Sequence, residues 1–382
     1  MIKIINVLTL CFIIFIIFIL SFFEKKLSYK IKKRILFWIT LIISIICGTR
    51  VIGLDLEPYR EIFNNQRMIP LNFVFIKNML ASRLEPIFVI LISLIKQVGL
   101  GFKTFLFISA IVPMYLVYLV ILKKEKDFPL VTFLFFLLIF LFRGPVDTVR
   151  HFFAATVYLT ALYSLSKGNK FNFYSMSLTS VLLHYSNIVV LLVKPLLNIK
   201  WSILKYLTTI MTFGALAFLG RELLIGYMSS FNFTNPILWK LQFYLLYRSE
   251  TYHYLNGLHE ILLFLMSYTI VFFNIIINLI GLKMREVIVK DNFYNLLLNS
   301  QIIGTIMVLV FSIFDASTLG LRLNFLFSIG SFFIIKQIIF NNLIKRKLIM
   351  FIFVVLFLCL YNFIIILYFG GIHDPKSPFF LG

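Results

Sequence analysis

Apolar stretches long enough to cross a bilayer recur along almost the whole chain. A helix needs about 20 mainly apolar residues to span the ~30 Å hydrocarbon layer, and such stretches run from Ile4–Phe23 to Ile349–Gly370. With 61% hydrophobic and only 13% charged residues, the 382-residue chain has more apolar surface than one water-soluble core could bury. We therefore expect an all-α, polytopic transmembrane helical bundle with about 11 to 13 membrane segments, some of them re-entrant. It would form a single integral membrane domain over 1–382.

Basic loops set the expected orientation of this bundle. The loop Glu24–Arg34 holds five lysines and one arginine, and such loops stay on the cytoplasmic side. The formal charge of +21 then reflects this positive-inside bias, and no nucleic-acid partner is expected. Two long polar segments, residues 50–85 and 221–255, come out on the outer face as loops that cover a substrate site. The basic loops along the chain all lie on the cytoplasmic side only if the segment Pro86–Leu100 does not cross the membrane. We therefore predict a re-entrant or interfacial helix there.

The number of membrane crossings is also open near residues 188–197. Either this stretch turns back towards the cytoplasm, which we favour, or Leu238–Tyr247 makes an extra crossing. The remaining expected spans are Ile35–Thr49, Thr104–Leu122, Phe128–Phe142, Phe152–Leu165, Phe171–Tyr185, Ser202–Gly220, Leu258–Leu282, Phe293–Phe314 and Leu321–Asn342.

Arginine and lysine partition differently in this map. Nine of the 12 arginines lie on or near the outer face, whereas only about six of the 24 lysines do. A guanidinium offers a planar, permanently charged fork that suits phosphate oxygens, which indicates an anionic ligand. Snorkelling to lipid headgroups is the alternative for any single arginine. The nine are Arg50, Arg60, Arg67, Arg83, Arg143, Arg150, Arg221, Arg248 and Arg322.

Four of these arginines, Arg50, Arg143, Arg150 and Arg322, sit at the ends of apolar stretches. An unpaired charge is costly there unless it faces a cavity or a partner. Between Arg143 and Arg150 a Gly-Pro pair turns the chain, and a helix is expected to begin near Thr148. Asp147 or Thr148 would cap that helix, and its positive N-terminal end would help Arg150 to attract an anion.

A few acidic and imidazole side chains share the predicted outer face. Asp55 follows Arg50, Glu85 precedes an apolar segment, and His184 lies near the outer end of another. Such residues in a membrane protein indicate function by default, although pairing with the arginines or interhelical hydrogen bonding would also explain them. The three cysteines lack paired spacing, and no nucleotide-binding, zinc-protease or serine-hydrolase motif occurs. No cofactor and no metal ion is therefore expected.

Five short motifs together resemble the EpsG family of Wzy-type polysaccharide polymerases. The match is best over residues 48–187 and thinner beyond. The motifs are Arg50-Val51-Ile52-Gly53-Leu54-Asp55 with Tyr59 and Phe63, similar to R-x-x-G-x-D-x-x-x-Y-x-x-x-F; Glu85-Pro86; Arg150-His151-Phe152-Phe153-Ala154; His184 with Ser186; and Arg322-Leu323.

The resemblance implies a helical fold like that of the GT-C glycosyltransferases and a multi-pass protein of the cytoplasmic membrane. Its site would face the periplasm or exterior and join undecaprenyl-diphosphate-linked repeat units by inverting, metal-independent glycosyl transfer. A chain-length regulator and a flippase are the protein partners that it suggests. Two other functions stay open on the residues alone: a flippase or transporter for the same lipid-linked oligosaccharide, and a membrane acyltransferase that modifies glycans.

The expected site divides into two roles. Arg150, helped by Arg143 and Arg322, would hold the donor diphosphate and stabilise the charge that grows as it leaves. One of Glu85, Asp55 or His184 would deprotonate the acceptor hydroxyl, and the residues leave that choice open. Arg50 and Tyr59 would hold the first outer loop and the acceptor sugar.

Overall fold

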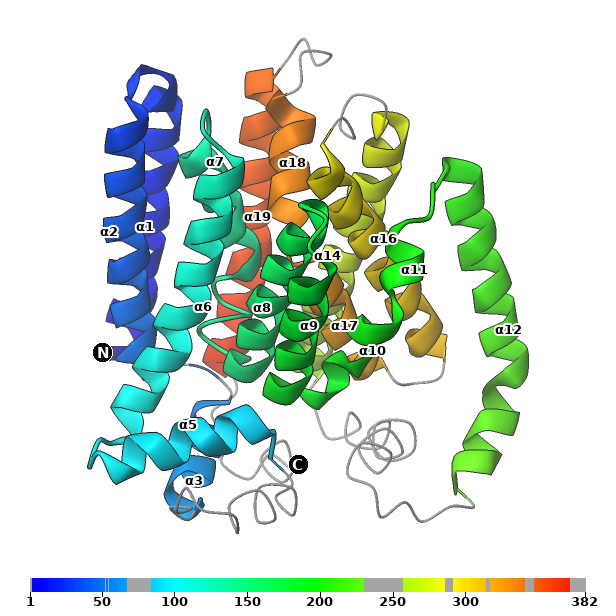
Figure 1. The fold of residues 1–382 in the computed structure, drawn as a ribbon, viewed down its shortest axis with the longest axis horizontal. Coiled ribbons are helices and arrows are strands. Elements are labelled where there is room, and N and C mark those ends of the chain that lie inside the picture. The colour runs from blue at the N-terminus through cyan, green and yellow to red at the C-terminus, as the bar shows by residue number, and fades with distance from the viewer. Residues whose placement is uncertain are drawn as a thin grey trace. The chain divides into compact units, whose positions relative to one another are not determined.

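The computed structural model describes residues 2–51, 53, 55–66, 84–229, 257–285, 291–313, 317–340 and 347–371. Every regular element in these residues is a helix, which confirms the all-α prediction for them (Figure 1). The chain divides into two compact units. Unit 1 is Met1–His184 with Asn342–Asn362, and unit 2 is Tyr185–Asn341 with Phe363–Gly382. The single membrane domain over 1–382 and the likeness to GT-C enzymes stay predictions.

Within the described residues, unit 1 contains nine helical elements and most of α19. They are α1 (Ile2–Phe23), η1 (Glu24–Lys26), α2 (Tyr29–Gly48), α3 (Leu56–Asn65), α5 (Pro86–Gln97), α6 (Phe102–Lys124), α7 (Pro129–Phe140), α8 (Val149–Ser166), α9 (Lys170–Leu183) and α19 (Lys347–Gly371). Unit 2 contains η2 (Tyr185–Ile188), α10 (Val189–Leu192), α11 (Lys194–Leu197), α12 (Ile203–Ser229), α14 (Gly257–Lys283), α16 (Asn292–Ile313), α17 (Ser317–Phe327) and α18 (Ser331–Phe340).

Several of these helices are apolar enough for a membrane-embedded protein. Within the described residues, five are long and apolar enough to cross a bilayer, or six if the bent pair α17 and α18 forms one span. This is fewer than the 11 to 13 expected segments, partly because some apolar helices are short. Pro86–Gln97, Pro129–Phe140 and Tyr268–Lys283 have 10 to 17 residues each. The higher count stays a prediction.

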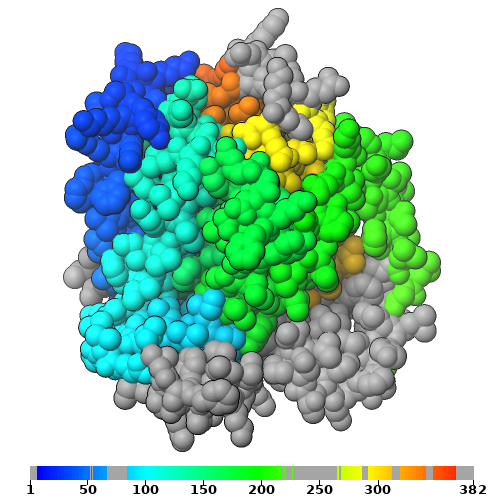
Figure 2. Space-filling view, in the orientation of Figure 1, coloured from blue at the N-terminus to red at the C-terminus, as the bar shows by residue number. Residues whose placement is uncertain are grey.

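In unit 1, α5 runs across the direction of α1 and α2 instead of alongside them (Figure 1). That Pro86–Leu100 does not cross the membrane stays a prediction. Figure 2 shows α5 and the first turns of α6, in light blue and cyan, as one continuous surface at an edge of this unit. The amphipathic helix α3 lies beside them, since Phe63 contacts both Phe102 and Phe105 with ring centroids 5.8 Å apart.

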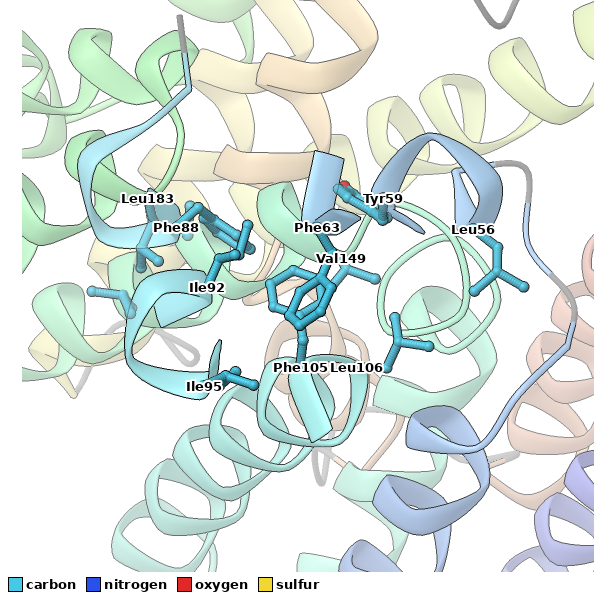
Figure 3. Packing of buried hydrophobic residues seen from close by; sticks show 12 residues of the cluster. Leu56, Tyr59, Phe63, Phe88, Ile92, Ile95, Phe105, Leu106, Val149 and Leu183 are labelled. Carbon is cyan, nitrogen blue, oxygen red and sulfur yellow. The ribbon is translucent and has the colours of Figure 1, made fainter. Parts of the chain in front are cut away.

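The apolar faces of α3, α5 and α6 meet the N-terminal turn of α8 and the end of α9 in one buried cluster. Its members include Tyr59, Phe63, Phe88, Phe105 and Val149 (Figure 3). Fully burying one such large side chain stabilises by about 1.5–3 kcal/mol. The cluster therefore fixes part of the predicted 50–85 loop against α8, whereas residues 67–83 lie outside the described part.

Unit 2 departs from the expected helices at two points. The helix α12 runs to Ser229, so residues 221–229 are helical and not part of an outer loop as predicted; residues 230–256 lie outside the description. The expected span Leu321–Asn342 is not one straight helix, because α17 and α18 bend by 53° at a break; that the bent pair forms one span stays a prediction. A Cβ atom on Gly330 would clash with Leu297, and Ser300 Oγ donates 2.7 Å to the Phe327 carbonyl freed by the break.

Buried amides tie three helices of unit 2 together at this break. Asn274 Nδ2 of α14 donates to Asn324 Oδ1 of α17 at 3.4 Å and to Ser328 Oγ, just after α17, at 3.1 Å. Gln301 Nε2 of α16 donates to Asn274 Oδ1 at 3.2 Å. Such interhelical hydrogen bonds are the polar counterpart of apolar packing inside a membrane bundle.

Candidate functional site

Glu85 lies at the start of α5 but does not cap that helix with its side chain. Pro86 occupies the first helical position, where a missing N–H is tolerated. The carboxylate instead reaches two other helices: Oε2 accepts from Arg150 Nη1 of α8 at 2.7 Å, and Oε1 lies 3.2 Å from Nδ1 of His184 at the end of α9. The structure thus brings together three of the four predicted catalytic residues.

This ion pair is built largely inside the protein. The Glu85 side chain is 1% exposed and that of Arg150 is 23% exposed. A carboxylate buried to this degree is stable only when it is paired and hydrogen-bonded, and both conditions are met here. The pair joins residues 65 positions apart in the chain, so the fold of unit 1 is required to form it.

Tyr59 on α3 contacts Arg150 through both its hydroxyl group and its ring. Its hydroxyl oxygen accepts a hydrogen bond from the Arg150 backbone N–H at 3.3 Å, and the guanidinium carbon lies 5.3 Å from the ring centroid. Burial, together with the nearby Asp55 carboxylate, raises the pKa of Tyr59 to about 12, although Arg150 opposes this shift. The phenol therefore stays neutral at ordinary pH.

This contact also corrects the predicted cap of α8. Thr148 is the N-cap residue, close to the expected start, but its side chain makes no capping bond and donates to the Arg143 carbonyl instead. The Asp147 carboxylate accepts from the Asp55 N–H at 3.4 Å. The free N–H at this helix end is used by Tyr59, so the capping acceptor comes from another helix.

His151 is the residue near the site that sequence reasoning missed as a candidate. Its ring lies 5.0 Å from that of His184, centroid to centroid, at an interplanar angle of 41°. Both imidazoles are buried. The signal was present, since His151 directly follows Arg150, but the partner of its ring is set by how α8 packs on α9. Ser180 Oγ donates to the Ala154 carbonyl at 2.9 Å in that interface, where small Ala154 allows close approach.

Arg50 follows the last turn of α2, and its side chain turns back on that helix. Its Nη1 donates to the Cys47 carbonyl at 2.5 Å. Tyr59, Asp147 and Asp55 are its other electrostatic neighbours. The predicted substrate-binding residues Arg50 and Tyr59 are thus neighbours. Because Tyr59 also contacts Arg150, it lies between the two arginines.

The other predicted residues are placed less completely. Arg143 Nη1 donates to the Tyr361 hydroxyl of α19 at 3.1 Å, within unit 1. Arg322 lies on α17, in unit 2, so its meeting with the unit 1 residues stays a prediction. Arg67, Arg83 and Arg248 lie outside the described residues. Among the described residues, no group of three or more His, Cys, Asp or Glu side chains could hold a metal ion.

A family model described as the EpsG family matches residues 33–380, which is nearly the whole chain. The chain belongs to the EpsG family. This confirms the resemblance drawn from the five motifs, and it indicates a role of the polysaccharide-polymerase type. Neither the curated proteins nor the solved structures include a match to the chain. Of the residues in the EpsG-like motifs, Arg50, Glu85, Arg150 and His184 all lie in unit 1, whereas Ser186 lies in unit 2.

Proposed function

We propose that this protein is a polysaccharide polymerase that joins lipid-linked oligosaccharide repeat units at the outer face of the cytoplasmic membrane. The observation that carries the proposal is the meeting of Glu85, Arg150 and His184, brought from three helices, in a chain of the EpsG family. The donor would be a growing glycan on undecaprenyl diphosphate. Its glycosidic bond is already activated by the diphosphate, so no separate energy source is needed.

His184 is the proposed general base, and Glu85 orients it. Arg150 favours the charged form of the Glu85 carboxylate, and in the proposed tautomer Nδ1 of His184 donates to Glu85 while Nε2 carries the basic lone pair. A carboxylate behind an imidazole fixes both the tautomer and the ring orientation. This assignment chooses among the three bases that the sequence left open.

In the proposed step, Nε2 of His184 takes the proton of the acceptor hydroxyl as that oxygen attacks the anomeric carbon of the donor sugar. The bond from this carbon to the diphosphate oxygen breaks, and the lipid diphosphate leaves with the electron pair. Direct displacement inverts the anomeric centre and needs a single base. A positioned base contributes about 10²–10⁴-fold to such a reaction.

In this scheme the arginines stabilise the negative charge of Glu85 and of the leaving diphosphate. Arg150 holds Glu85 through Nη1, and its side chain, which is 23% exposed, adds positive charge beside the leaving diphosphate. Arg143 and Arg322 are the further proposed diphosphate ligands. Asp55, whose backbone N–H is bound by Asp147, is assigned to holding the turn after α2.

The test is made in cells that lack the native gene and carry Glu85→Gln, His184→Asn or Arg150→Lys. Each variant should reach the membrane at the normal level but leave single repeats at the outer face in place of long chains, seen as a lost ladder in glycan electrophoresis. Arg60→Lys is the matched control, because Arg60 forms an exposed pair with Glu57 on α3. Long polymer from all three variants would refute the site. Single repeats trapped at the inner face would indicate a flippase.

A further inference from the structure

Arg50 holds an unused pair of hydrogen-bond donors. Arg50 is 4% exposed, and its Nη1 is bound to the Cys47 carbonyl. Nε and Nη2 are buried and have no hydrogen-bond partner among the residues that the structure describes. Buried charged donors left without acceptors are costly, and native proteins rarely keep two of them on one side chain without a use.

The two unused atoms lie on the same edge of the planar guanidinium. Nε–H and the adjacent Nη2–H point in parallel and bind two oxygens of one phosphate or carboxylate at once. A lysine could not reproduce this, because its ammonium is a point charge. In the described part of the chain, one complete bidentate edge of Arg50 therefore has no acceptor.

The backbone beside this edge is a glycine in a conformation that other residues rarely adopt. Gly53 has φ +121°, and an added Cβ would clash with the Val146 carbonyl oxygen. The same Cβ would lie 3.7 Å from Arg50 Nε. The Val146 carbonyl therefore packs closely against Gly53 beside this edge, and a ligand reaches the two buried Arg50 atoms only after a local shift at this end of α2.

We infer that the Nε/Nη2 edge of Arg50 binds one phosphate group of the lipid diphosphate. The inference rests on the proposed function and names the ligand atoms of the same site. Arg50 lies at the expected outer end of a membrane helix, the depth at which the phosphates of a membrane lipid lie. A carboxylate or a sugar oxygen would also accept hydrogen bonds from this edge. The charged residues beside Arg50 give a way to distinguish a phosphate ligand from a sugar.

Asp147 and Asp55 are electrostatic neighbours of Arg50. They compensate its charge when the edge is empty and repel an anion that enters. An arrangement of this kind weakens the binding of diphosphate, which helps a polymerase to release its leaving group after each step. Neutralising Asp147 should therefore tighten the binding of a phosphate, whereas it would weaken the binding of a sugar hydroxyl that donates to the carboxylate.

The experiment uses the purified full chain in detergent and native mass spectrometry with undecaprenyl diphosphate, undecaprenyl phosphate and undecaprenol. Wild type should bind the diphosphate and the monophosphate more tightly than the alcohol. Arg50→Lys and Arg50→Gln should weaken diphosphate binding by about tenfold or more, the range for a lost charge-assisted pair of hydrogen bonds. Asp147→Asn, which keeps an acceptor for the Asp55 N–H, should tighten it a few-fold. Arg60→Gln is the control and should change nothing.

Equal binding of undecaprenyl diphosphate and undecaprenol by wild type would overturn the inference, as would unchanged diphosphate binding in both Arg50 variants. Weaker binding in Asp147→Asn would overturn it in favour of a sugar ligand. The proposed catalytic site is tested by separate variants. If Arg50 variants lose diphosphate binding while Glu85→Gln and His184→Asn still make long polymer, the phosphate site stands and the proposed catalytic site fails.

Discussion

Replacing Arg150 by methionine removes the cation that faces a buried carboxylate. Arg150 Nη1 lies 2.7 Å from Glu85 Oε2, and opposite charges at that distance attract by about 6 kcal/mol at an effective dielectric constant of about 20. Desolvation and the 23% exposure of the Arg150 side chain offset part of this attraction. We therefore expect Arg150→Met to lower the free energy of unfolding by about 3–5 kcal/mol, the cost of stranding one buried charge.

The double variant Glu85→Gln/Arg150→Met should recover much of that loss, because no uncompensated charge is left inside the protein. Thermal unfolding of the purified proteins in one detergent, followed by intrinsic fluorescence, gives the ranking. Arg60→Met is the control, since its pair with Glu57 has side chains 48% and 56% exposed and should contribute less than about 1 kcal/mol. An Arg150→Met variant as stable as Arg60→Met, or a double variant no better than the single one, would refute the reasoning.

Three other predictions concern single contacts. Wild type should lose more stability than Tyr59→Phe as the pH rises from about 10 to 12, because the folded-state pKa of Tyr59 is raised to about 12 and folding favours the neutral phenol; parallel pH-unfolding curves would contradict this. Glu24→Ala should cost about 1–3 kcal/mol, since its buried carboxylate accepts from the Leu130 and Val131 N–H groups at 2.6 and 3.0 Å; an unchanged melting temperature would exclude that role. Gly330→Ala should destabilise by about 1–3 kcal/mol through its clash with Leu297, and a variant as stable as wild type would show that the α17–α18 break can relax.

The sequence predicted helices well where the signal is local. Apolar runs place α1, α6 and α19 near their expected bounds, and the start of α8 falls at Val149, next to the predicted Thr148. Charge and glycine also marked Pro86–Leu100 as unusual, and α5 lies across its neighbours there (Figure 1). Each of these features depends on hydropathy or turn residues within one segment.

The break between α17 and α18 could not be read in the same way. Leu321–Asn342 is mostly apolar, and Gly330 between Ile329 and Ser331 is compatible with a straight helix as well as with a kink. The sequence does not show that Ser300 of α16 donates a hydrogen bond to the Phe327 carbonyl. The bend depends on side chains from other helices, including Leu297 packed against Gly330. Tertiary partners of this kind override local propensity.

The candidate site shows the same division. Residue type and position singled out Glu85, Arg150 and His184, because charged groups at apolar helix ends are uncommon. Pairing of acidic residues with arginines was one of the expected alternatives, but the sequence did not show that Glu85 pairs with Arg150, which was expected to hold an anion. His151 was not predicted as a site residue because its role depends on the side chain that it contacts. That side chain, His184, is 33 positions away in the sequence.

The most direct measurement reconstitutes the purified protein in vesicles with one synthetic repeat unit on undecaprenyl diphosphate and follows the products by mass spectrometry. Wild type should convert the substrate into dimers, trimers and longer glycans, with one undecaprenyl diphosphate released for each bond formed. His184→Asn should be slower by about 10²–10⁴-fold while Arg60→Lys keeps the wild-type rate. Unchanged elongation by His184→Asn and Glu85→Gln, or a wild-type protein that never forms a dimer, would contradict the assignment of this cluster to glycan polymerisation.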